Sequence, residues 1–420
     1  MHRSVFTIAV MTACLVIPQV MAQEPTRSLD ELLAALEASS EATRAEAAAT
    51  INKLGQDALP ALLKMLDDPS PDTRSLAANA LGLIGIDDEV VIAALLIRLD
   101  DAELRSDDMP VWGSAARAIG QLGPKSVPRL IAKLSADNRT GRRAAAIALH
   151  DIKPPPKNAV PALIVMLIQN EPETRIAAMY TILALDPKPA ASAMSSLHAM
   201  LDSDDFHTQY WACRTIAAVG APEALVTVPK LMELTASGVT SVRSNAAEAL
   251  GLIGAPVGKR PIESLTKVVG DQNYVVRRAG VIALGRLGKL ATASAPTVRA
   301  AMLDASRSIQ AEAAAALWQI TDAHEESLPI LLKVLQDHNA PWEAAQGFER
   351  LGAAGQPAVA DLAKLVEAAP GETQYFATLA LSGIGPAAKD ALPALRKLLE
   401  SPDEDMRQVA EQVIEHIGGE

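Results

Sequence analysis

One short motif recurs along the whole chain and limits what it can fold into. Residues 77–85 have the sequence AANALGLIG, and residues 246–254 have the nearly identical sequence AAEALGLIG. A second pattern, Pro-x-Leu-x-x-x-Leu, precedes such motifs, as at Pro60, Leu62 and Leu66, and returns about every 33 residues. Self-similarity at this period is typical of repeat proteins, in which each copy contacts only its neighbours. We therefore expect about twelve copies of one unit.

Each copy is predicted to form two helices. Proline suits the first turn of the first helix, where its missing N–H has no partner to lose. The second helix is rich in alanine and ends at glycine, which tolerates the left-handed conformation of a helix C-cap. Aromatic residues make up only 3% of the chain, which argues against a large sheet. The sequence predicts an all-α solenoid over 23–420, with repeats starting near residues 28, 58, 89, 125, 158, 191, 224, 258, 293, 326, 356 and 390.

The repeated unit resembles a known family. Residues 242–254 follow the pattern Val-Arg-x-x-Ala-Ala-x-Ala-Leu-Gly-x-Ile-Gly, which is similar to a HEAT repeat. The short bacterial subtype named after phycobilisome lyases resembles it most, and the likeness extends over about residues 28–418. The resemblance implies a superhelix of helical hairpins and is specific for fold rather than function. We do not carry the lyase activity over, because the sequence contains no sign of phycobilin chemistry. The capping box at Ser28 and Glu31 and the polar last helix lead us to expect that the array begins and ends within this chain.

The first 22 residues have the features of a secretory signal. His2 and Arg3 precede an apolar run over 5–17, and the small residues Val20 and Ala22 would place cleavage before Gln23. We therefore expect an exported protein, periplasmic or extracellular, without a membrane span, because the run is too short to cross a bilayer comfortably. Lipidation at Cys14 is the alternative, since small residues precede this cysteine.

Charge and cysteine content narrow the function further. The net charge of −12 argues against nucleic acid, which requires a dense basic surface. Cleavage would leave Cys213 as the one cysteine, so no intrachain disulfide is expected. We interpret Cys213 as a buried thiol, with a reactive or intermolecular cysteine as the alternative.

Arginine recurs eleven residues before the final glycine of the second helix, at what we call the arginine position. In HEAT repeats, which these copies resemble, such arginines form a ladder with aspartates in the turns between repeats. We therefore interpret the arginines at this position as structural. They are Arg44, Arg74, Arg142, Arg175, Arg243, Arg277 and Arg407.

Five repeats lack this arginine, and aromatic residues gather there instead. The position holds Trp112, Gln209, Gln310, Pro341 and Gln374. In four of these repeats an aromatic side chain lies at the position or within two residues of it. Aromatic residues at one place in a repeat indicate either a binding surface or filling of irregular gaps between repeats. Repeat 3 also carries an insertion at 102–111, which is either a recognition loop or a tolerated surface insertion.

A relatively basic stripe follows the second helices. It contains the residue after the arginine position and the residues four and eight further on, which share one helix face. It holds seven basic residues but only two acidic ones, Asp151 and Glu248. If it lines the concave face, we expect it to bind a protein with an anionic surface, centred on Tyr180, Tyr210 and Arg214. The alternative is that the stripe points into neighbouring repeats. The predicted partner-binding residues are Trp112, Arg117, Tyr180, Tyr210, Trp211, Arg214, Arg278, Trp342, Arg350, Tyr375 and Phe376.

No sequence motif points to catalysis. The chain contains neither His-Glu-x-x-His nor Cys-x-x-Cys, and no nucleophile elbow or P-loop. A metal site at His198, His207 and Asp205 is less favoured than ordinary turn residues. We predict a monomeric, non-catalytic scaffold without cofactor or metal that binds another protein. The alternatives are an accessory subunit of an envelope enzyme complex, or a module that binds a polyanion or a carbohydrate.

Overall fold

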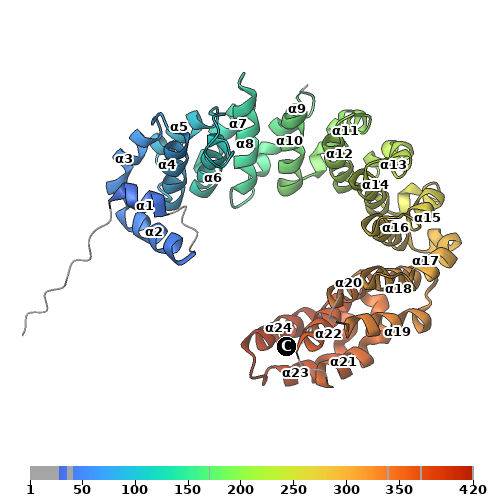
Figure 1. The fold of residues 1–420 in the computed structure, drawn as a ribbon. Helices are drawn as coiled ribbons and strands as arrows, with labels where there is room; N and C mark the ends of the chain where they lie inside the picture. The colour runs from blue at the N-terminus through green and yellow to red at the C-terminus, as the bar shows by residue number, and fades with distance from the viewer. Residues whose placement is uncertain (1–27, 36–40, 170, 338–339, 369–370, 419–420) are drawn as a thin grey trace, which may run out of the picture.

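The chain folds into an open crescent of stacked helical hairpins (Figure 1). The computed structural model describes residues 28–35, 41–169, 171–337, 340–368 and 371–418. Within these residues, 24 α-helices follow one another in pairs, and the all-α solenoid expected from the sequence is confirmed. The proposed signal segment, residues 1–22, lies outside the described residues.

The first helix of each hairpin lies on the convex side of the crescent. In Figure 1 this is clearest for α7, α11 and α15. Most of these helices are short, and 3-10 turns lead into many of them. They are α1 (Leu29–Ala35), α3 (Leu59–Met65), α5 (Glu89–Arg98), α7 (Val127–Lys133), α9 (Val160–Met166), α11 (Met194–Met200), α13 (Val228–Leu234), α15 (Ile262–Val268), α17 (Ala295–Ala301), α19 (His324–Leu335), α21 (Val359–Ala368) and α23 (Leu392–Leu398).

The second helix of each hairpin lies on the concave side and packs against the second helices before and after it (Figure 1). These helices are α2 (Glu41–Leu54), α4 (Pro71–Ile84), α6 (Val111–Leu122), α8 (Arg139–Asp151), α10 (Pro172–Leu185), α12 (Phe206–Val219), α14 (Thr240–Ile253), α16 (Tyr274–Leu287), α18 (Arg307–Thr321), α20 (Pro341–Leu351), α22 (Glu372–Ile384) and α24 (Glu404–Ile417).

The ends of the helices follow from local chemistry. Ser28 and Glu31 form the expected capping box, with the Glu31 N–H donating to Ser28 Oγ at 3.2 Å and the Ser28 N–H donating to Glu31 Oε2 at 2.8 Å. Asp205 begins α12 by accepting hydrogen bonds from the N–H groups of His207 and Thr208. Gly85 ends α4 with a φ of 69°, a left-handed conformation that glycine adopts without steric strain.

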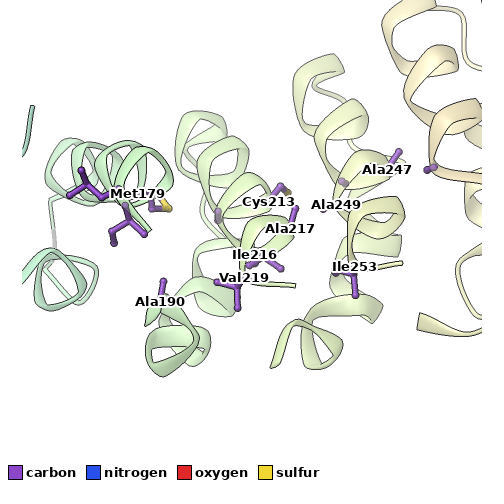
Figure 2. Close-up of a cluster of buried hydrophobic side chains, with 14 of the residues drawn as sticks. Met179, Ala190, Cys213, Ile216, Ala217, Val219, Ala247, Ala249 and Ile253 are labelled. Atoms are coloured by element: carbon purple, nitrogen blue, oxygen red, sulfur yellow. The ribbon is translucent and has the colours of Figure 1, made fainter. Parts of the chain in front are cut away.

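The core runs along the crescent between neighbouring hairpins. Figure 2 shows Met179 of α10, Cys213 of α12 and Ala249 of α14 pointing into this interior. Cys213 is fully buried, and burial raises the pKa of its thiol to about 12. Its thiol is therefore neutral and shielded at ordinary pH, which makes it a poor nucleophile.

Candidate functional site

The basic stripe runs along the second helices, which form the concave side of the crescent (Figure 1). Three of its members, Arg117 of α6, Arg214 of α12 and Arg286 of α16, are exposed. The two acidic members of the stripe, Asp151 and Glu248, are exposed as well. The alternative, in which the stripe points into neighbouring repeats, describes other members: Arg278 and Arg350 bond to the buried Glu312 of α18, and the α18 stripe residues Ala311 and Ala315 are fully buried.

Aromatic side chains from three consecutive second helices stack on this face. The ring of Tyr180, on α10, stacks on His150 of α8 at 4.3 Å and meets the edge of Trp211 of α12 at 5.4 Å. Tyr210 packs edge-on against Trp211 at 5.1 Å. The Arg214 guanidinium lies 5.6 Å from the ring centres of both Tyr210 and Trp211 and donates to the Tyr210 hydroxyl at 2.9 Å. We call these five residues the aromatic cluster.

The aromatic cluster is a preformed, half-exposed surface. Tyr180 is 36% exposed, and Tyr210 and Trp211 are partly buried. The rings and the guanidinium fix one another through edge contacts, cation–π contacts and one hydrogen bond, so a ligand would order few further side chains on binding. The sequence prediction placed Tyr180, Tyr210 and Arg214 at the centre of the face, and the structure brings these three side chains together.

Trp112 lies further toward the N-terminus, beside a groove formed with the inserted loop. The Arg143 guanidinium of α8 lies 5.1 Å from the ring centre of Trp112. The groove has a volume of about 590 Å³, and Leu104 and Met109 of the loop also line it. Both loop side chains are more than half exposed. The insertion therefore adds apolar surface beside Trp112.

The inserted loop is held against the preceding repeat. The N–H and hydroxyl of Ser106 both donate to Oδ1 of Asp72, at the start of α4, at 3.1 and 2.8 Å. Arg105 forms an ion pair with Asp107 at 3.2 Å, and Leu104 pairs with Pro110 in an isolated bridge. These bonds give the loop a defined conformation, so Leu104 and Met109 stay beside Trp112.

The remaining predicted aromatic residues lie on the other arm of the crescent, where α20 and α22 are found (Figure 1). Trp342 of α20 is 51% exposed, and its ring centre lies 6.3 Å from that of Phe376 of α22. Tyr375 and Phe376 pack edge-on at 5.2 Å and line an open groove of about 1090 Å³ beside the last hairpin. The predicted residues thus form two separate groups rather than one surface.

Arg278 and Arg350, which the sequence prediction placed among the partner-binding residues, are both engaged in ion pairs. Glu312 of α18 has a fully buried carboxylate that accepts a hydrogen bond from Arg278 at 2.7 Å and another from Arg350. The Arg278 and Arg350 side chains are 33% and 20% exposed. Burial, together with repulsion from Arg278 and Arg286, lowers the pKa of Arg350 to about 10.

The arginine position has a consistent geometry in three repeats. Arg74, Arg243 and Arg277 each donate Nη1 to a carbonyl oxygen of the turn before their own helix. The same side chains donate Nε to Asp101, Asp271 and Asp304 of the following repeat, at 2.7, 2.8 and 2.8 Å. Each arginine therefore links its own turn to the next repeat.

The other arginines at this position differ. Arg142 donates to the carbonyl oxygen of Ala136 at 2.8 Å and forms an ion pair with Glu171 at 3.3 Å. Arg407 donates to the carbonyl oxygen of Ser401. The Arg175 Nε has no hydrogen-bond partner among the described residues, and the Arg44 side chain lies outside them.

Where glutamine replaces arginine, only half of this arrangement survives. Gln310 donates to the Asp304 carbonyl at 2.6 Å and Gln374 to the Val366 carbonyl at 2.7 Å, but neither amide bonds to a described residue of the following repeat. Gln209 bonds the Leu201 carbonyl in the same way, at 3.2 Å. The shorter amide satisfies its own turn only, and in the Gln310 repeat Arg307 makes the link to the next turn instead, through an ion pair with Asp337 at 2.9 Å.

Two important groups were not found from the sequence. Glu312 lies one residue outside the stripe, so the periodic count passed over it, although one acidic residue within the alanine run 311–316 was a detectable signal. His150 was not among the predicted residues, but it stacks on Tyr180. The described residues contain no group of three or more His, Cys, Asp or Glu placed to hold a metal ion. None of the described helices is both long and apolar enough to cross a membrane.

Stacked hairpins linked through their inner turns define an α-solenoid repeat protein. A family model of HEAT repeats matches residues 29–107, 160–251, 194–285, 228–318 and 262–349, which together cover more than half of the chain. The chain belongs to the HEAT repeat family. It is therefore a HEAT-repeat scaffold, a class typical of protein–protein interaction and generally non-catalytic.

Solved structures with similar folds include importin-β proteins. A structure of importin-β in an ammonium sulfate condition shares 15% identity with a TM-score of 0.60, covering 93% of this chain and 62% of that one. Yeast importin-β shares 14% identity with a TM-score of 0.61, covering 93% of this chain and 61% of that one. An engineered protein shares 21% identity over 93% of this chain and 98% of its own, but with a TM-score of only 0.36. At these identities the likeness shows the fold alone. No curated protein sequence matches this chain.

Proposed function

We propose that this chain is an exported scaffold that binds a protein partner along its concave face, with the aromatic cluster at the centre. The observation that carries the proposal is the stacking of Tyr180, Tyr210, Trp211 and Arg214 on a solvent-facing surface. Tyrosine, tryptophan and arginine dominate binding hot spots because they bury a large area with few rotatable bonds.

The charge of the concave face supports a partner with an anionic surface. Arg117, Arg143 and Arg214 line this face in a chain whose net charge is −12. An anionic partner would be attracted to this face and repelled by the acidic remainder of the molecule, which would orient the encounter. The groove beside Trp112 would extend the contact toward the N-terminal arm.

Export and subtype are further parts of this proposal. The basic start, apolar run and small residues of 1–22 support a signal segment, and the intact mass of the secreted chain would show cleavage before Gln23. The repeat spacing of about 33 residues supports the short bacterial HEAT subtype. We also propose that the chain itself is not an enzyme and acts by holding its partner.

The test is a double substitution at the centre of the aromatic cluster. Tyr210→Ala with Arg214→Ala should weaken binding of the partner captured from the native envelope by at least about tenfold, or 1.4 kcal/mol. Binding would be measured with purified proteins by calorimetry. Tyr274→Ala with Arg129→Ala is the matched control, because both side chains are exposed and lie outside the stripe.

Equal affinities of the two double variants would refute the proposed centre. A partner that is an enzyme and depends on this chain for activity would favour the accessory-subunit alternative. Binding of a sulfated polysaccharide that is lost in the Tyr210 and Arg214 variant, with no protein captured, would favour the polyanion-binding alternative.

A further inference from the structure

We propose that α16, α18 and α20 form a binding site for the carboxylate groups of an acidic protein segment. Its residues are Arg278, Arg286 and Arg350, which we call the arginine triad: Arg278 and Arg350 bond to the buried Glu312, and Arg286 shares a face of α16 with Arg278. The inference deepens the proposed function, since it names the chemistry that the concave face binds on the second arm of the crescent. It concerns a different set of residues from the aromatic cluster.

The triad carries more positive charge than its surroundings neutralise. Two guanidinium groups bond to one buried carboxylate, and Arg286 adds a third positive charge whose field reaches Arg350, while the field of Glu248 on α14 reaches Arg286. Arg278 and Arg286 repel Arg350 strongly enough, together with burial, to lower its pKa to about 10. An anion bound at this place would relieve that repulsion, whereas a cation or a neutral group would not.

Most of the hydrogen-bonding capacity of the triad is unused. A guanidinium group has five N–H donors in a planar fork that matches a carboxylate. Arg278 uses Nη2 for Glu312 at 2.7 Å and for Gln346 at 3.4 Å, while its Nε has no acceptor. The exposed Arg286 makes no hydrogen bond or ion pair with the part of the chain that the structure describes.

The alanine-rich surface of α18 explains how the triad comes together. Ala311 and Ala315 occupy the stripe positions of this helix and are fully buried. Their small side chains allow the long arginines of α16 and α20 to reach across α18, so that Arg278 contacts Gln346 on the far helix. A groove of about 360 Å³, lined by Gln346 and Trp342, adjoins the triad. An apolar side chain next to the bound carboxylate could contact Trp342 there.

The fold itself indicates that a carboxylate is the matching ligand. Glu312 is already bound by two arginines from two different helices. A segment with several carboxylates would add further groups of the same chemistry, with the exposed Arg286 as their partner. We therefore assign the site to glutamate or aspartate side chains of a protein rather than to phosphate.

The experiment uses the full chain and a fluorescein-labelled hexaglutamate peptide, with binding followed by fluorescence anisotropy. Arg286→Ala should weaken binding at least about fivefold, because this arginine makes no hydrogen bond or ion pair among the described residues and its loss is not expected to disturb the structure. The matched control is Arg129→Ala, which removes an exposed arginine of α7 outside the stripe and should change binding less than about twofold. Equal effects would indicate general charge attraction and overturn the site.

A second variant changes the internal carboxylate. Glu312→Gln keeps the shape of the side chain and removes its negative charge, so the triad should bind the peptide more tightly, by at least about twofold. Peptide binding weakened by Glu312→Gln and Arg286→Ala alike would point to a structural cluster and contradict the proposal. Inorganic phosphate that binds in an Arg286-dependent way, with no peptide binding, would also contradict it. These results do not depend on Tyr210 and Arg214, so the two proposals can fail separately.

Discussion

Arginine at the arginine position joins two repeats with one side chain. The Nη1 of Arg243 donates to the Ser237 carbonyl at 2.8 Å. Its Nε and Nη2 donate to the carboxylate of Asp271 in the next repeat, at 2.8 and 3.2 Å. Both partners of this ion pair are less than one-fifth exposed. Charge-assisted bonds shielded from water in this way stabilise more than ordinary surface ion pairs do.

We predict that the two functions of Arg243 can be separated. Arg243→Ala should lower the free energy of unfolding by about 1–3 kcal/mol, because it removes both the turn bond and the link to Asp271. Arg243→Gln should lower it by roughly half as much, since an amide can still bond the turn carbonyl as Gln310 does. Urea denaturation followed by circular dichroism measures both. Equal losses would show that the turn bond contributes nothing.

The ion pair between Arg243 and Asp271 makes the stability of the fold depend on pH. Burial would raise the pKa of Asp271, but hydrogen bonds from Arg243 and from the Asn273 N–H outweigh it and leave this pKa below its ordinary value. A carboxylate whose pKa is lowered by folding stabilises the fold above its unfolded pKa, about 3.9, and loses this contribution as the pH falls further. The stability difference between the wild type and Arg243→Ala should therefore shrink between pH 6 and pH 3.

At the scale of the helix, close packing between second helices requires glycine at particular places. A Cβ atom at Gly251 of α14 would lie 2.6 Å from the Cα and 2.8 Å from the Cβ of Ala283 on α16. These contacts are too short for two helices in their present positions, so any side chain here would force the repeats apart. Gly113 of α6, in contrast, has no atom within 4 Å of its would-be Cβ.

The two glycines should therefore respond in opposite directions to the same substitution. Gly251→Ala should destabilise the chain by about 1–3 kcal/mol, because overpacking outweighs the better helix propensity of alanine. Gly113→Ala should stabilise it by about 0.5–1 kcal/mol, since alanine has a higher helix propensity than glycine and its Cβ would meet no other atom there. Thermal denaturation of the two variants compares them directly. Stabilisation by Gly251→Ala would mean that α14 and α16 separate without loss.

Helix boundaries and contacts within one helix could be predicted from the sequence, whereas contacts between distant helices could not. Proline in the first turn and glycine after the last turn place most helices, because both residues act through local backbone chemistry. Arg214 and Tyr210 are four residues apart on one helix, so their contact follows from helical geometry. The meeting of Arg278 and Arg350 at Glu312 does not, because it depends on how far α18 separates α16 from α20.

At the scale of the whole molecule, the spacing of repeats determines the solenoid but not its curvature. Curvature comes from the small rotation between successive hairpins, which depends on side-chain contacts between repeats. This is why the predicted aromatic residues separate into one group around Trp211 and another around Trp342 on different arms of the crescent (Figure 1). The repeat pattern places all of them at or close to the arginine position or on the stripe, and it carries no information on the distance between them.

The last hairpin differs from the others in a way that bears on stability. Glu411 of α24 occupies the place that Ala78 and Ala247 occupy in their helices, and it is exposed whereas those alanines are fully buried. The equivalent residue of α22 is Thr378, which is also fully buried. The polar side chain on α24 therefore suits a helix face that has no further hairpin against it.

Removing this hairpin should turn a covered face of α22 into an exposed apolar one. A chain deleted from Asp390 onward should elute as aggregates in size-exclusion chromatography, because Leu362 and Leu381 lose the cover that α23 and α24 provide. The same deletion with Thr378→Glu transplants the polar residue of α24 onto the new end and should aggregate less. If the truncated chain without Thr378→Glu stays monomeric, the last hairpin is not needed as a cap. If both truncated chains aggregate equally, Glu411 is not the residue that protects the end of the array from aggregation.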